Sequence, residues 1–134
     1  MCRRSTLTNL ESVNDWTLEN KATSSIVYID FTKAFDLVSH TKLLQKLESY
    51  GIQDSLLSWL KSFLSDRFQC TKVGLSVSSW IPIHNYGVIQ GSCLGPLLFL
   101  LYINDITDII APTVAIKMYA DDVKLYTEIN SDKN

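Results

Sequence analysis

Apolar residues recur along this chain with two different periods. Over residues 41–50 and 54–65 they lie three or four positions apart, which is typical of one face of a helix. The segments 26–31, 114–119 and 123–126 are instead short runs rich in β-branched and aromatic residues, a composition that favours strands. A nearly continuous apolar run within 96–108 predicts a buried helix. The pattern as a whole predicts an α+β fold, with a small antiparallel sheet and helices packed on one face of it.

The remaining elements follow from local signals. Residues 6–19 have an approximate helical period, and residues 68–77 and 79–88 are expected to be paired strands, with Pro82 confining the second to an edge. Gly51 is suited to ending the helix at 41–50, and Asp54 is suited to capping the next one. The last two strands form a hairpin whose turn carries Asp121 and Asp122.

Composition narrows the class of protein. A length of 134 residues with 46% hydrophobic content suits one globular domain, and a net charge of −2 is not the basic footprint of a free-standing nucleic-acid binder. Three widely spaced cysteines indicate reduced thiols in an intracellular protein, whether nuclear or cytoplasmic. We expect no secretory signal and no membrane association, since the apolar run at 94–103 is far below the ~20 residues that cross a bilayer.

Three aspartates carry the candidate chemistry. Asp121 and Asp122 are adjacent at a hairpin turn, and Asp30 ends a buried strand far upstream. If the hairpin lies beside that strand, three carboxylates converge, and their repulsion is relieved by two divalent cations such as Mg²⁺ or Mn²⁺. Paired metals of this kind serve in-line displacement at phosphorus, so the sequence predicts phosphoryl or nucleotidyl transfer.

The same segments match a known family. Residues 28–36 (YIDFTKAFD), 87–99 (GVIQGSCLGPLLF) and 119–122 (YADD) closely resemble three successive motifs of reverse transcriptases, and residues 100–106 (LLYINDI) are similar to those of non-LTR (LINE-type) retrotransposons. The resemblance runs in order over about residues 6–128. It implies that residues 1–134 are a partial reverse transcriptase domain, an RNA-directed DNA polymerase palm whose partners are an RNA template, a DNA primer and a dNTP.

The resemblance assigns roles to single residues. Asp30, Asp121 and Asp122 would be the catalytic aspartates that bind two Mg²⁺ (or Mn²⁺) ions. Phe35 matches an aromatic steric gate against the ribose 2′-hydroxyl, although an aromatic buried in the core is the alternative.

Further residues match the substrate-binding side of the family. Gln90, Gly91 and Ser92 match a loop against the nascent base pair, with an ordinary loop that begins a helix as the alternative. Ile89 replaces the family's usual proline, which predicts a looser loop. Tyr119 would brace the hairpin, or be only a half-buried strand residue, and Phe31 joins this substrate-binding set.

Four other polar residues have simpler expected roles. Lys33 and Asp36 follow the motif without a derivable function, so a surface ion pair or turn contact is expected. His40 is expected to begin a helix, and Arg67 to be a solvated strand charge, with a contact to nucleic-acid phosphate as the alternative.

The short segments before Asp30 and after Asp122 lead us to expect truncated fingers and thumb, and little processive activity from this chain alone. Two other interpretations stay open. A viral RNA-dependent RNA polymerase shares the paired acids, but Ala120 and Phe35 oppose it, because that family commonly has glycine before the acids and no aromatic gate. A non-catalytic retrotransposon remnant would bind metal or nucleic acid weakly at most.

Overall fold

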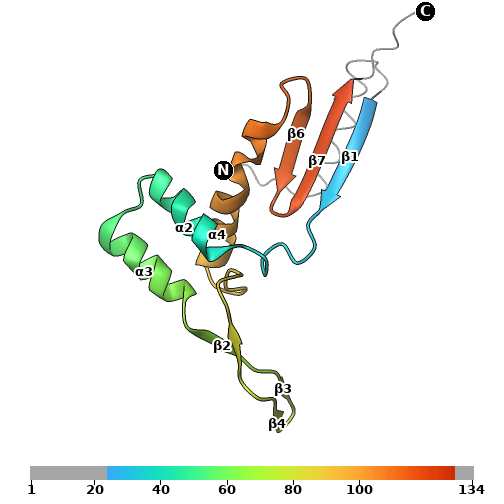
Figure 1. The fold of residues 1–134 in the computed structure, drawn as a ribbon. Coiled ribbons are helices and arrows are strands. Elements are labelled where there is room, and N and C mark those ends of the chain that lie inside the picture. The colour runs from blue at the N-terminus through green and yellow to red at the C-terminus, as the bar shows by residue number, and fades with distance from the viewer. Residues whose placement is uncertain (1–23, 129–134) are drawn as a thin grey trace, which may run out of the picture. The chain divides into compact units, whose positions relative to one another are not determined.

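The chain divides into two compact units, seen in a computed structural model that describes residues 24–128 (Figure 1). One unit joins the segments before Lys33 and after Asn104 and contains a three-stranded sheet. The other spans Lys33–Asn104 and contains the helices α2, α3 and α4. Helices and antiparallel strands together confirm the α+β prediction, and the helix expected at 6–19 lies outside the described residues.

The sheet consists of β1 (Ser24–Asp30), β7 (Asp122–Glu128) and β6 (Ala115–Tyr119), in that spatial order and all antiparallel. In Figure 1 the last strand of the chain, β7, lies between the other two. The predicted strands are therefore confirmed, and Asp30 is the final residue of β1. The predicted hairpin is also confirmed, but its turn consists of Ala120 and Asp121, because Asp122 is already the first residue of β7.

The helical unit begins with α2 (His40–Ser49) and α3 (Asp54–Leu64), each within one residue of its predicted bounds. Gly51 follows α2 with a φ of +86°, and its N–H donates to Glu48 O over 2.9 Å, while Ile52 N–H donates to Leu47 O over 3.0 Å. This pair of bonds is the Schellman arrangement, so the predicted helix end is confirmed. The predicted cap at Asp54 is wrong: Gln53 is the N-cap, and Asp54 is the first helical residue with no side-chain capping bond.

The buried helix is shorter than predicted. α4 spans Leu94–Ile103, and a 3₁₀ helix, η1 (Asn104–Ile109), replaces its expected last turn. The change comes where the apolar run gives way to Asn104, Asp105 and Thr107, whose side chains compete for backbone hydrogen bonds. Within residues 24–128, every helix is too short or too polar to cross a membrane.

The second predicted hairpin differs in its turn. β2 (Arg67–Gln69) pairs with β5 (Ile81–Ile83), and β3 (Lys72–Val73) pairs with β4 (Ser76–Val77) at the tip. The chain therefore reverses inside the predicted 68–77 strand, at Gly74, whose φ of +59° suits a tight turn. Pro82 lies opposite Phe68 in a two-stranded ladder, where each strand is an edge.

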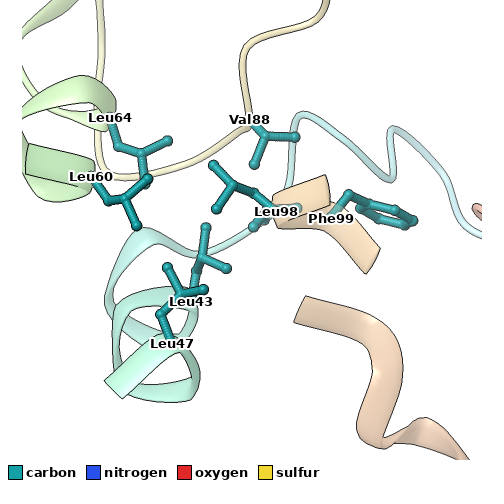
Figure 2. Packing of buried hydrophobic residues seen from close by; sticks show 8 residues of the cluster. Leu43, Leu47, Leu60, Leu64, Val88, Leu98 and Phe99 are labelled. Atoms are coloured by element: carbon teal, nitrogen blue, oxygen red, sulfur yellow. The ribbon is translucent and has the colours of Figure 1, made fainter. Parts of the chain in front are cut away.

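The helical unit has one apolar core. Figure 2 shows leucines of α2, α3 and α4 gathered around a common centre, with the Phe99 ring on the other side of α4. Its buried members are Val38, Leu43, Leu47, Leu60, Leu64, Val88, Leu98 and Phe99. α2 is also tied to α4 by Lys46, whose ammonium donates to Tyr102 O and lies 5.0 Å from the centroid of the Tyr102 ring.

Leu47→Ala is expected to lower the free energy of unfolding by about 2–5 kcal/mol, because Leu47 is 0% exposed and its loss leaves a cavity. Urea unfolding followed by circular dichroism measures the change. Leu75→Ala is the matched control, since Leu75 is 101% exposed at the hairpin tip and should change stability by less than ~0.5 kcal/mol. Equal losses for the two variants would contradict the core described here.

Candidate active site

Asp30 and Asp122 lie directly opposite each other on neighbouring strands. The β1–β7 register pairs them as the last of seven cross-strand pairs, after Tyr28 with Lys124 and Ile29 with Val123. Directly opposite residues of an antiparallel pair project from the same face, with Cβ atoms about 4.5–5.5 Å apart. Both aspartates are exposed. The sheet therefore brings two carboxylates that are 92 positions apart in the sequence to one end of the β1–β7 ladder, on the same face.

Asp121 belongs to the two-residue loop between β6 and β7. The loop is closed by the pair Tyr119 and Asp122, and Ala120 has a φ of +53°, in the left-handed region. Asp121 is half-buried next to the cross-strand pair. Tyr119 is 45% exposed and lies across from Asp122, on the face that carries the two opposed aspartates.

The donor set suits a hard divalent cation in part. Carboxylate oxygens are the ligands that Mg²⁺ and Mn²⁺ prefer, and two of them are opposed across the ladder. Among residues 24–128, however, no three His, Cys, Asp or Glu side chains are gathered as a ligand set. The structure thus assembles the Asp30–Asp122 pair and leaves Asp121 adjacent in the loop, without the full three-carboxylate convergence.

A lysine lies in the next row of the same sheet face. Lys124 is opposite Tyr28 on one side and Lys117 on the other, one alternation behind Asp122. It is only 8% exposed, and its ammonium lies 5.5 Å from the centroid of the Tyr28 ring. Sequence reasoning missed Lys124, although the period of two along β7 already places it on the face of Asp122.

The helical unit holds the other motif residues. Phe35 is half-buried, and its ring stacks on Phe99 with centroids 4.5 Å apart and an interplanar angle of 16°. Phe35 also packs against the core, which is the alternative that the sequence left open. Phe31 is half-buried directly after β1, in the sheet unit.

A run of backbone hydrogen bonds joins residues 35–40 to residues 85–88. Val88 N–H donates to Phe35 O over 2.9 Å, and Gly87 N–H donates to Val38 O over 2.8 Å. His40 N–H donates to Asn85 O over 2.9 Å, and its Nε2 donates to Gly87 O over 2.8 Å. His40 begins α2, as predicted, and its ring secures this pairing from a buried position.

The segment that carries Gln90 is fixed at both ends. Gln90 Nε2 donates to Asp36 Oδ1 over 2.9 Å. The Ser92 hydroxyl donates to Ile89 O over 2.7 Å and accepts from Gly95 N–H over 2.9 Å, so Ser92 satisfies one N–H in the first turn of α4. Gly91, with a φ of +82°, makes the turn between them.

Gly95 sets how closely this loop approaches α4. A Cβ added at Gly95 would be 2.4 Å from Ile89 O, so no other residue fits without moving the backbone. Sequence reasoning gave Gly95 no such role, since only the contact with Ile89 makes it apparent.

Arg67 is not the solvated strand charge that the sequence predicted. Its guanidinium is partly buried and donates to three carbonyls, those of Leu64, Tyr86 and Gly87. Desolvation by this burial lowers the pKa of Arg67 from its usual value. Its role is to hold the base of the β2–β5 hairpin against the segment that leads into the Gln90 loop.

Comparison with known proteins identifies the family of the chain. Residues 3–133 match the reverse transcriptase (RNA-dependent DNA polymerase) family. The chain belongs to the reverse transcriptases. The resemblance inferred from its three motifs is therefore confirmed for nearly the whole chain.

Relatives of this reverse transcriptase chain come from mobile elements. It is 35% identical over 120 residues to an RNA-directed DNA polymerase from the mobile element jockey of Drosophila melanogaster, covering 85% of this chain. It is 34% identical over 125 residues to a probable RNA-directed DNA polymerase from transposon BS of the same species, covering 84% of this chain. A Pol polyprotein from the type-1 retrotransposable element R2 of Popillia japonica is 34% identical over 84 residues, or 63% of this chain. These are polymerases of non-LTR elements, the group that the motifs resemble, and the matches cover only 13–14% of each relative's length.

Asp122→Asn is expected to stabilise the metal-free protein by about 0.2–1 kcal/mol, because it removes one of two like charges placed directly opposite. Thermal unfolding in EDTA at low salt measures the rise in Tm, which should shrink as salt screens the repulsion. Asp108→Asn is the control, since Asp108 is an exposed aspartate of η1 outside the sheet. A lower Tm for Asp122→Asn than for the unchanged chain would contradict the pairing of these carboxylates.

Proposed function

We propose that this chain is the palm portion of a non-LTR retrotransposon reverse transcriptase, which transfers nucleotides from dNTPs to a DNA primer on an RNA template. The observation that carries the proposal is the register of β1 on β7, which sets Asp30 opposite Asp122. Family membership supports the same reaction. The proposal includes an intracellular location and a palm-like fold for the chain.

Asp30, Asp121 and Asp122 are the residues that would hold Mg²⁺ or Mn²⁺, in a two-ion site. The bound ions would supply the positive charge that nucleotidyl transfer requires at the reacting phosphate. The chain's own part is to hold Asp30 and Asp122 exposed at one end of the β1–β7 ladder, with the half-buried Asp121 next to them. Tyr119, opposite Asp122, would limit the space in which Asp122 can turn.

The burial of alternate residues along β7 supports the proposal of a palm-like sheet. Residues that alternate with Asp122 and Lys124 along β7 are Val123, which is 1% exposed, and Leu125, which is half-buried. One side of β7 thus carries Asp122, Lys124 and the buried Tyr126, and the other carries apolar residues that are buried or half-buried.

The helical unit would supply contacts to the nucleotide. Phe35 is proposed as the gate against the ribose 2′-hydroxyl, held in place by its stack on Phe99. Gln90 is exposed and would contact the nascent base pair. Gly91 and Ser92 would shape this loop, with Ser92 acting through the backbone it binds. Phe31 belongs to the proposed substrate-binding set through its place beside Asp30.

Titration with Mn²⁺ by calorimetry tests the metal site. Asp30→Asn, Asp121→Asn and Asp122→Asn are each expected to weaken Mn²⁺ binding at least about tenfold, because each removes a charged oxygen ligand. Asp108→Asn should leave the binding unchanged, since that residue lies outside the sheet. Binding that is equal in the unchanged chain and in all three sheet variants would refute the site, and the chain would then be better described as a non-catalytic remnant.

Addition of a single nucleotide to a DNA primer on an RNA template tests the gate, since one turnover does not depend on processivity. Phe35→Val is expected to lower the preference for dNTP over rNTP by roughly tenfold or more, because it opens the space that a 2′-hydroxyl requires. Phe63→Val is the control for general loss of packing, since Phe63 is also half-buried and stacks on Trp59 with ring centroids 5.6 Å apart. An unchanged preference in Phe35→Val would leave Phe35 as a core residue only.

A further inference from the structure

We propose that Asp36 is a positioning residue that fixes the orientation of the Gln90 side-chain amide, so that Gln90 presents its carbonyl oxygen to the nucleotide. The contact of Gln90 with a nucleotide rests on the proposed function, whereas the orientation of the Gln90 amide depends on the chain alone. The observation is the 2.9 Å hydrogen bond from Gln90 Nε2 to Asp36 Oδ1, between residues 54 positions apart.

The backbone brings these two side chains together. Asp36 N–H donates to Lys33 O over 2.9 Å in a turn, and the residue before Asp36 accepts the N–H of Val88. Gly87 packs directly on Asp36, and a Cβ added at Gly87 would be 3.1 Å from Asp36 O. Gly87 also has a φ of +83°, a conformation that favours glycine. Asp36 is therefore held against the start of the Gln90 loop on two sides.

The far side of the loop is equally restrained. Ile89 O accepts from the Ser92 hydroxyl, and Gly95 leaves no room for the loop to shift toward α4. Gln90 thus projects from a restrained backbone, and within its bond to Asp36 the amide has one freedom, the choice of which end faces the carboxylate.

The chemistry of a carboxylate removes that freedom. An ionised Asp accepts hydrogen bonds and donates none, whereas a Gln amide donates through nitrogen and accepts through oxygen. Only the nitrogen end of Gln90 can face Asp36, and the opposite orientation would set two oxygen acceptors against each other. The Gln90 Oε1 must then face away from Asp36, where Gln90 is exposed. The nucleotide group it accepts from would be an N–H or O–H donor.

Exchange of Asp36 for asparagine separates orientation from hydrogen bonding. Asn has nearly the same shape, but its amide pairs with either end of Gln90, so Asp36→Asn keeps a hydrogen bond and loses the preference. Asp36→Ala loses both. Asp108→Ala is the control on an exposed aspartate of η1.

The first measurement is the NMR spectrum of the Gln90 side-chain amide in the 134-residue chain. In the unchanged protein we expect one of the two Nε2 protons to be shifted downfield and slowed in exchange by the bond to the carboxylate. This signature should be lost in Asp36→Ala and averaged in Asp36→Asn. Amide signals that are the same in the unchanged protein and in Asp36→Ala would overturn the proposal.

The second measurement is the binding of dTTP with Mn²⁺. Asp36→Ala is expected to weaken it about fivefold and Asp36→Asn about twofold, with Asp108→Ala unchanged. A merely structural role predicts instead that Asp36→Asn binds dTTP as well as the unchanged protein does, and that result would overturn the positioning role. If the NMR contrast is present and no protein binds dTTP, the proposed function fails while the orientation of Gln90 stands.

Discussion

The register of β1 on β7 is the constraint on which the candidate active site depends. Side chains alternate along a strand, so a slip of one residue would move Asp30 to the opposite face from Asp122. The same slip would exchange the buried Val123 with its polar neighbours. The seven-pair ladder of β1 on β7, together with the burial of Val123, therefore holds two like-charged carboxylates opposite each other.

In the helical unit, backbone hydrogen bonds bring together motif residues that are distant in the sequence. Residues 35–40 pair with residues 85–88, and this one pairing brings Phe35 and Asp36 close to the loop of Gln90. Gly87 is central to it, because its carbonyl accepts from both His40 and Arg67 while its missing side chain allows contact with Asp36. Two motifs separated by two helices are thereby joined without any long-range ion pair among the residues named here.

Local periodicity explains which parts of this architecture the sequence predicts. The strands around the aspartates, α2 and α3 have strong patterns and clear ends, such as Gly51 after α2, and they form nearly as expected. The end of α4 is less predictable, because the side chains that follow it are of the kind that compete for backbone hydrogen bonds. The turn at Gly74 is less predictable because it depends on the φ of +59° at that one residue. The aspartates are recognisable from their motifs, but their opposition in register comes only from strand pairing.

Other features had no local signal at all. The tight approach of Gly95 to Ile89, the carbonyl contacts of Arg67 and the bond between Asp36 and Gln90 all join segments that are not periodic neighbours. From charge and hydropathy alone, such residues are expected on the surface. Their actual partners are backbone atoms or amides distant in the sequence, which charge and hydropathy do not indicate.

Ala120 introduces backbone strain into the hairpin loop. A left-handed conformation costs an L-residue about 1–2 kcal/mol, whereas glycine would adopt it freely along with many others. The loop is thus bent by the two strands that flank it against the preference of its own residue. Asp121 therefore lies in a turn that stores backbone strain. The ladder of β6 and β7, more than the turn itself, determines where the Asp121 carboxylate lies.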